Sequence, residues 1–320
     1  MIEATLIHAD ILKRFALLDE RERLAHAYLL VGPEGVGKKE TALALAKMLN
    51  CTGVKSGQNL YCNACPPCQK INSGNHPDVW TIEAPPNETI KIEEVRNILD
   101  QVRLRPFEAN KKVFILRRAE SLTAEAANAL LKTLEEPTAS SLLLLTTASP
   151  DNVIETVRSR CHAVHFLTAA KDKLAAQLMT YYHVNGLEAK FLAHYVHGST
   201  GRAKELHAAK FFERKNALID EFILTPDVSA FLKKLSEKED VRALLDVLLS
   251  WTRDAVLFKL GNDREQLIHQ DRIRDLERFQ GRFTFEELRS LFKKIVESRE
   301  LFEENLNAKL SLLIVKEMMR

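Results

Sequence analysis

The fold of this chain is indicated most clearly by one glycine-rich stretch, Gly32-Pro33-Glu34-Gly35-Val36-Gly37-Lys38. It fits the first seven positions of the phosphate-binding pattern G-x-x-x-x-G-K-[ST], in which backbone N–H groups approach the phosphates and the lysine reaches the β- and γ-phosphates. An apolar run at residues 27–31 precedes it, and alanine and leucine recur at helical spacing over residues 39–49. A strand, a glycine-rich loop and a helix in this order predict a P-loop fold rather than a chance glycine turn.

The same stretch lacks the residues that hydrolysis needs. The eighth position of the pattern, where a hydroxyl binds Mg²⁺, is Lys39. The apolar run at residues 113–116 ends in Arg117-Arg118, where acids that bind Mg²⁺ and orient water would be expected. We therefore expect no ATP hydrolysis by the chain itself. Whether the two arginines form salt bridges or line the vacated metal site is left open, as is ATP binding by the degenerate set Gly32, Gly35, Gly37 and Lys38.

Four of the five cysteines form a C-x10-C-x2-C-x2-C cluster made of Cys51, Cys62, Cys65 and Cys68. Disulfides are disfavoured in a reducing compartment, whereas four thiolates in one short segment can enclose a tetrahedral Zn²⁺. A redox C-x-x-C would leave two cysteines unexplained, and Pro66-Pro67 favours a tight metal-wrapped knuckle over an active-site helix. The cluster predicts structural zinc with no open position for catalysis. Cys161 stands apart and is expected to be an ordinary, partly buried residue.

Composition narrows the class of protein. A chain of 320 residues suggests two or three domains. A net charge of +2 with 28% charged residues excludes a globally basic nucleic-acid binder. No apolar stretch approaches the ~18–20 residues of a membrane span, and Met1-Ile2-Glu3-Ala4-Thr5 lacks the layout of a secretory signal. These features predict a soluble, cytoplasmic protein.

Patterning along the chain predicts an α/β part followed by a helical part. Strands are expected at residues 28–31, 79–83, 113–116, 142–146 and 163–166, with helices beginning near Lys38, Ile92, Thr123 and Val153. Residues 50–77, which hold the cysteine cluster, form an insertion. After Thr168 short helices are expected, broken at Asn185-Gly186 and at residues 198–201. Two later helices are predicted from apolar residues at helical spacing: Val241, Leu244, Leu245, Leu248, Trp251 and Ala255, then Leu288, Leu291, Phe292, Ile295 and Val296.

Several motifs resemble those of bacterial clamp-loader AAA+ subunits. They are Leu24-Ala25-His26-Ala27-Tyr28-Leu29, the four-cysteine insertion, Asn128-Ala129-Leu130-Leu131-Lys132-Thr133-Leu134-Glu135-Glu136-Pro137, Arg158-Ser159-Arg160-Cys161 and Asn305-Leu306-Asn307-Ala308-Lys309-Leu310. In this order they span nearly the whole chain. The resemblance implies an AAA+ P-loop domain at residues 1–166 with its insertion at 51–68, a small helical lid at 167–207 and an all-α collar at 208–320.

The resemblance also implies partners and a mechanism. Clamp loaders of DNA polymerase III are pentameric rings with ATP at subunit boundaries, so the implied partners are gamma/tau and delta subunits and, through the complex, the sliding clamp and primed DNA. Arg160 matches the arginine of the family's Ser-Arg-Cys motif, which implies action in trans on nucleotide held by a neighbouring gamma/tau subunit. A guanidinium suits that role because it offers permanent charge and a rigid fork of donors. Arg202 resembles the family's second nucleotide sensor.

Two alternatives from other classes are weighed against a noncatalytic subunit. An ATP-hydrolysing gamma/tau-like subunit would carry Ser/Thr after the loop lysine and Asp-Glu after the later strand, where this chain has Lys39 and Arg117-Arg118. A zinc-dependent nucleic-acid-binding module would need a basic, aromatic-bearing surface around the knuckle. Lys55 and Lys70 are thin support for such a surface. The sequence therefore favours a noncatalytic clamp-loader subunit.

Overall fold

The computed structural model describes residues 8–53, 60–85, 88–235, 238–303 and 308–319. The first residues of the chain, Lys55 and the Asn305-Leu306-Asn307 part of the last motif lie outside these ranges. The chain divides into two compact units, Met1–Thr168 and Ala169–Arg320. Each unit has its own hydrophobic core and is described separately.

The first unit is an α/β layer structure around a five-stranded parallel sheet in the order β2-β3-β4-β1-β5. The strands are β1 (Ala27–Val31), β2 (Val79–Ile82), β3 (Lys112–Leu116), β4 (Ser141–Thr147) and β5 (His162–His165). The helices are α2 (Ala9–Glu20), α3 (Lys38–Asn50), α4 (Pro66–Ser73), α5 (Ile92–Val102), α6 (Ala124–Glu135) and α7 (Glu155–Arg158). All five predicted strands are present, and no strand end differs from its prediction by more than one residue.

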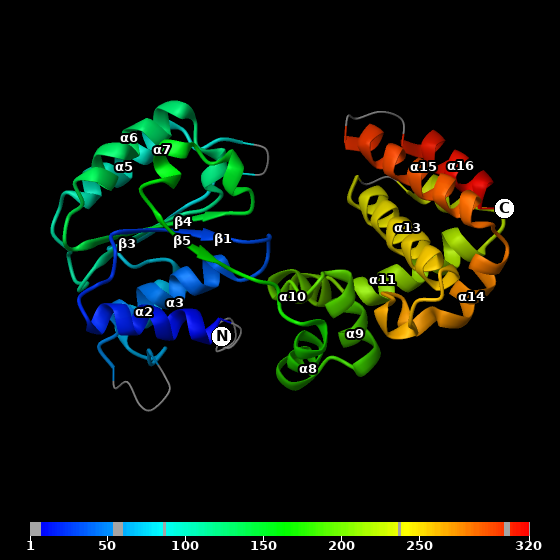
Figure 1. Cartoon of the computed structure of the whole chain (residues 1–320), viewed down its shortest axis with the longest axis horizontal. Helices are drawn as coiled ribbons and strands as arrows, with labels where there is room; N and C mark the ends of the chain where they lie inside the picture. The colour runs from blue at the N-terminus through cyan, green and yellow to red at the C-terminus, as the bar shows by residue number, and fades with distance from the viewer. Residues whose placement is uncertain (1–7, 54–59, 86–87, 236–237, 304–307, 320) are drawn as a thin grey trace. The chain divides into compact units, whose positions relative to one another are not determined.

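Alternation along the central strands explains why helices cover both faces of the sheet. In β1, Tyr28 and Leu30 pack with α2 and α3, whereas Leu29 and Val31 pack with α5 and α6 on the other face (Figure 1). Strands β3 and β4 alternate in the same way, and every residue of β1, β3 and β4 is buried. A sheet buried on both faces explains why these strands read as continuous apolar runs. The carboxyl ends of its parallel strands meet at one edge, beside the glycine-rich loop.

One helix was not anticipated. Pro66-Pro67 was interpreted as part of a tight metal-wrapped knuckle rather than an active-site helix, and in the structure the two prolines occupy the first turn of α4, with Cys65 as the preceding cap residue. Proline suits that position because its fixed φ is helical and its missing N–H would have no partner there. The segment that carries Cys68 is therefore helical, and the knuckle is formed by the chain before it.

The second unit is helical, and its described residues contain no strand. Its helices are α8 (Lys171–Tyr182), α9 (Gly186–Tyr195), α10 (Thr200–Ala208), α11 (Phe211–Leu218), α12 (Ser229–Lys234), α13 (Lys238–Lys259), α14 (Ile273–Gly281), α15 (Phe285–Glu303) and α16 (Ala308–Met318). The predicted breaks are confirmed: Asn185 caps α9 by accepting the N–H of Glu188, and Gly198 has φ +83° before α10. Among the described residues no helix is both long and apolar enough to cross a bilayer.

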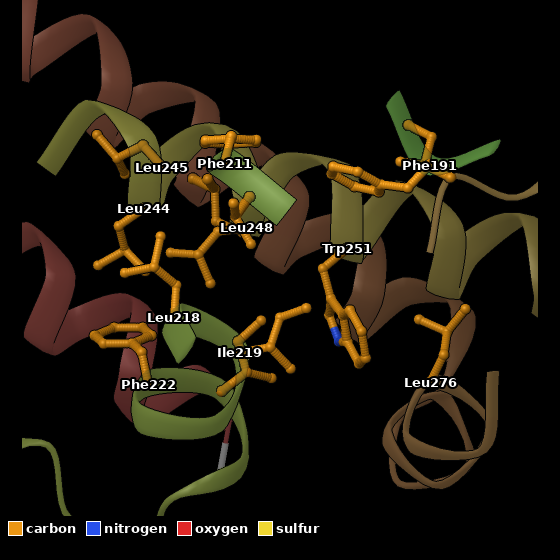
Figure 2. Packing of buried hydrophobic residues seen from close by; sticks show 14 of the residues in the cluster. Phe191, Phe211, Leu218, Ile219, Phe222, Leu244, Leu245, Leu248, Trp251 and Leu276 are labelled. Carbon is orange, nitrogen blue, oxygen red and sulfur yellow. The ribbon is translucent and has the colours of Figure 1, made fainter. Parts of the chain in front are cut away.

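The core of the second unit forms around α13. Trp251 is fully buried there, and Figure 2 shows it among Phe191 of α9, Leu276 of α14 and Ile219, the residue that follows α11. All six residues that predicted this helix are buried. In α15 the prediction holds for Leu288, Leu291 and Ile295, but Phe292 is 38% exposed and Val296 is half-buried. The apolar face of α15 is therefore narrower than its sequence suggests.

Candidate nucleotide, metal and arginine sites

The glycine-rich loop joins β1 to α3 at the carboxyl edge of the sheet. Gly37 has φ +107°, a conformation that a residue with Cβ rarely adopts, and it lies against the ring of His8. Gly32 approaches the backbone of Phe166 so closely that an added Cβ would stand 2.6 Å from its carbonyl oxygen. Two of the glycines are therefore required by the path of the backbone. The structure has the strand, loop and helix that the sequence predicted.

The lysine of the loop is engaged with the loop itself. Lys38 Nζ donates hydrogen bonds to the carbonyl oxygens of Gly32 and Pro33, the latter at 2.8 Å, and the residue is only 9% exposed. Burial lowers the pKa of Lys38, and the positive charge of Arg117 adds to that effect against the nearby carboxylates of Glu120 and Glu34. In this conformation the ammonium is satisfied by backbone oxygen atoms.

His8 closes the other side of the loop, a contact that the sequence analysis missed. Its Nε2 lies 2.7 Å from the carbonyl oxygen of Val36, and because a carbonyl only accepts, Nε2 must carry the proton. Burial lowers the pKa of His8, which favours this neutral form. The ring also packs edge-on against Phe166, with centroids 4.7 Å apart. His8 is 28 residues from Val36, so no local pattern could have revealed the pair.

The end of β3 carries cations with partners in the chain. Arg117 forms an ion pair with Glu83, which follows β2. Arg118 has φ +56°, and its N–H donates to Thr146 Oγ1 over 3.3 Å. Of the two possibilities left open by the sequence, the salt bridge is the one that the structure shows for Arg117. The positions that would bind Mg²⁺ in a hydrolytic site therefore hold a lysine, Lys39, and a paired arginine.

The four cysteines of the insertion come together. Their sulfur atoms all lie within 4.8 Å of one another, and the Sγ atoms of Cys51 and Cys65 are 3.9 Å apart. Two sulfurs bound at ~2.3 Å to a tetrahedral zinc ion would be about 3.8 Å apart, so the cluster has the size that zinc requires. Burial raises the pKa of the Cys65 thiol, but hydrogen bonds from backbone N–H groups outweigh burial and lower that pKa to about 5. These donors favour the thiolate of Cys65, whereas burial raises the pKa of the Cys68 thiol.

A lysine reaches the knuckle from α3 and was not predicted. Lys47 Nζ donates to the amide oxygens of Asn63 at 3.0 Å and Asn72 at 2.9 Å, and it lies 4.6 Å from the centre of the Tyr61 ring. Burial lowers the pKa of Lys47, while the nearby Cys68 acts in the opposite direction. A zinc ion with four thiolates carries a charge of −2, so a buried ammonium beside it balances part of that charge.

Arg160 lies two residues beyond α7 and is 36% exposed in its side chain. Its Nε and Nη2 both contact Glu135 Oε1, at 2.9 and 2.6 Å, and its Nη1 donates to the carbonyl oxygen of Thr156 at 3.0 Å. Arg158 pairs separately with Asp151 at 3.1 Å. Cys161 is half-buried, as expected, and burial raises the pKa of its thiol to about 12. Arg160 is thus an exposed arginine with a defined orientation.

Arg202 belongs to the second unit, in the first turn of α10. It pairs with Glu205 over 3.1 Å and lines a cavity of about 900 Å³. The cavity is lined by the arginines Arg202, Arg214, Arg242, Arg253 and Arg299. Arg202, Arg214, Arg253 and Arg299 form ion pairs with carboxylates, so their positive charge is balanced. The role of Arg202 as a nucleotide sensor stays a prediction.

Comparisons with known proteins cover nearly all of the chain. The family described as "DNA polymerase III, delta subunit" matches residues 7–170, and "DNA polymerase III, delta subunit, C terminal" matches residues 209–320. The DNA polymerase III subunit delta' of Bacillus subtilis is 29% identical over 300 residues, covering 90% of this chain and 88% of the relative. The tau subunit of Salmonella typhimurium is 38% identical over 157 residues, 49% of this chain and 24% of its own length.

A solved structure shares the architecture. The gamma subunit-related protein of Thermotoga maritima superposes with a TM-score of 0.50 at 19% identity, over 96% of this chain and 99% of that one. This likeness concerns the fold alone. It agrees with the parallel α/β core followed by helices that the sequence predicted.

Proposed function

The chain belongs to the family of DNA polymerase III delta subunits, and we propose that it is a noncatalytic, delta prime-type subunit of the clamp loader. In this role it joins gamma/tau and delta subunits in a pentameric ring that loads the sliding clamp onto primed DNA. The delta' relative that matches over most of both chains supports this assignment. The tau relative matches over only about half of this chain.

The observation that carries the noncatalytic part is the chemistry at the carboxyl edge of the sheet. Lys39 cannot bind Mg²⁺ as a hydroxyl would, and Arg117 occupies the end of β3 in an ion pair with Glu83. Hydrolysis needs a metal ion and an oriented water, and both depend on ligands that are replaced here by cations. The backbone of the loop and Lys38 remain, but binding of ATP requires that Lys38 give up its hydrogen bonds to Gly32 and Pro33.

The contribution of the chain to hydrolysis is made in trans by Arg160. Its guanidinium is exposed at the turn after α7, and its planar fork of donors suits a phosphate oxygen. Placed at a boundary between subunits, it would stabilise the charge that develops on the γ-phosphate bound by the next subunit. Arg202 is assigned a secondary role in sensing nucleotide, on the resemblance of its motif alone.

Zinc has a structural role in this proposal. Cys51, Cys62, Cys65 and Cys68 would hold one Zn²⁺ as four thiolates, and the size of their cluster supports this assignment. With all four positions filled by sulfur, the ion fixes the insertion and takes no part in catalysis. Lys47 ties the same insertion to α3.

The test is a ring reconstituted with wild-type chain or with Arg160→Ala, with Arg158→Ala as the matched control. Arg160→Ala should change the unfolding free energy by roughly 0.5 kcal/mol or less, because an exposed ion pair contributes little. It should slow hydrolysis at one boundary by about 10³–10⁵, and the ring as a whole by less because the other sites keep their arginines. An assembled mutant ring with wild-type rates of clamp- and DNA-stimulated ATPase and of clamp loading would refute the trans mechanism.

A further inference from the structure

Glu135, the last residue of α6, contacts Arg160 across 25 residues of sequence. Its Oε1 accepts from both Nε and Nη2 of the guanidinium, while the carbonyl of Thr156 accepts from Nη1. The guanidinium is therefore held from two directions, by a carboxylate on α6 and by the backbone of α7. The Arg158-Ser159-Arg160-Cys161 motif predicts neither contact, because Glu135 and Thr156 both lie outside it.

These contacts use only part of the hydrogen-bond donor capacity of Arg160. A guanidinium has five N–H groups, and the contacts with Glu135 and Thr156 engage three of them. The Ser159 hydroxyl stands 3.5 Å from Nη1, at the limit of a hydrogen bond. Glu135 occupies the Nε–Nη2 edge, so one N–H group on Nη1 and one on Nη2 are left by these contacts for an oxygen atom from outside the chain. The carboxylate thus orients Arg160 without occupying the whole donor surface.

The position of Glu135 is unfavourable unless the carboxylate has a partner. It ends α6, where the helix dipole disfavours negative charge. The ion pair with Arg160 offsets that repulsion, and it also restricts a long, flexible side chain to one orientation. The side chains of Arg160 and Glu135 are 36% and 51% exposed, so a neighbouring subunit can reach the pair.

We propose that Glu135 is the positioning residue for Arg160, holding its guanidinium ready for a phosphate oxygen of nucleotide bound by the adjacent subunit. This inference rests on the proposed trans action of Arg160. Orientation before the neighbour docks removes part of the ordering cost at the moment of reaction, which appears in the rate of the chemical step. Glu135 does not touch the nucleotide, so the affinity for ATP is unchanged.

The experiment is a double-mutant cycle in the reconstituted ring. Clamp- and primed-DNA-stimulated ATPase is measured against ATP concentration for wild type, Glu135→Ala, Arg160→Ala and the double variant. Glu135→Ala should lower kcat by about three- to tenfold with KM for ATP within about twofold, since a misplaced group costs rate rather than binding. Glu135→Asp should recover part of the rate. In the Arg160→Ala background, Glu135→Ala should have no further effect.

Glu136→Ala is the matched control, because it removes the same charge from the next residue. In the described part of the structure Glu136 forms no ion pair, and its variant should match wild type. If Arg160→Ala is slow and Glu135→Ala is as fast as wild type, the positioning inference is wrong and the proposed function stands. If Arg160→Ala itself matches wild type, the proposed function fails first. A Glu135→Ala defect that persists without Arg160 would also overturn the inference, because Glu135 would then act through another group.

Discussion

Replacing Lys47 by methionine tests how the zinc knuckle is anchored to the nucleotide-binding fold. The substitution keeps most of the aliphatic stem and removes only the ammonium, which donates to Asn63 and Asn72 and lies over the ring of Tyr61. These three residues belong to the insertion, whereas Lys47 belongs to α3, the helix that follows the glycine-rich loop. The variant therefore breaks the polar link between the two parts and leaves the four cysteines unchanged.

The size of the effect follows from the contacts. A hydrogen bond from a charged donor contributes about 1.5–3 kcal/mol, and Lys47 makes two. Both asparagines are half-buried, so water replaces part of the lost interaction, and burial of the ammonium already costs free energy, as its lowered pKa shows. We expect a net loss of about 2 kcal/mol. If the loss falls on the zinc-bound form, zinc affinity decreases about 30-fold, since ~1.4 kcal/mol corresponds to a factor of ten.

The assay is a competition between the full-length chain and a chromophoric zinc chelator. Wild type should bind about one Zn²⁺ per chain, and Lys47→Met should release it at a correspondingly lower chelator concentration. Lys13→Met, which removes an exposed lysine from α2, is the control and should behave as wild type. An unchanged zinc affinity together with an unchanged urea midpoint for Lys47→Met would refute the reasoning. Absence of zinc from wild-type protein purified without chelator would refute the metal site itself.

Two further predictions concern catalysis and pH. The isolated chain should hydrolyse no ATP above background, because the metal ligands are replaced; Mg²⁺-dependent turnover that Lys38→Ala abolishes would contradict this. Asp78 is buried, and although burial raises its pKa, the N–H groups of Glu108, Phe107 and Ala109 and the charge of Lys112 lower it overall. The ionised Asp78 carboxylate therefore stabilises the folded chain at pH values above the unfolded-state pKa of about 3.9. This stabilisation is lost as the pH falls through the lower pKa of the folded state. Asp78→Asn should lower the unfolding free energy by about 2–3 kcal/mol at pH 7 and by less near pH 3, measured by urea denaturation; an equal loss at both pH values would show that the charge is irrelevant.

The parts of the fold that were predictable have local causes. The runs around Tyr28, Val113 and Leu142 are continuous and apolar because their strands are buried on both faces, and composition alone therefore locates them. The glycine loop follows from the backbone conformation that Gly37 must adopt. The four cysteines are predictable as a set because metal ligation requires their spacing. The buried face of α13 was predictable because its apolar residues, including Trp251, recur at helical spacing.

The parts that were missed depend on contacts between distant segments. His8 reaches Val36 over 28 residues, and Glu135 reaches Arg160 over 25. Patterns of hydrophobicity specify which face of an element is buried, but they do not specify which charged residue on another element meets it. The helix at Pro66 is a different case, because a local signal was present: proline in a first helical turn is favourable, and the knuckle interpretation outweighed it.

The contrast between Lys38 and Arg160 bears on the division of labour within a ring. Lys38 is buried and bonded to the oxygens of its own loop, so any phosphate that enters must displace existing hydrogen bonds. Arg160 is held by the carboxylate of Glu135 and the carbonyl of Thr156, and these contacts leave two of its five N–H groups unused. Binding to the first group involves an exchange of partners, whereas binding to the second adds partners to an oriented group. Loss of the metal ligands at the chain's own loop therefore leaves the action of Arg160 on a neighbouring subunit intact. The affinity of the isolated chain for ATP is accordingly separable from its effect on hydrolysis by that neighbour.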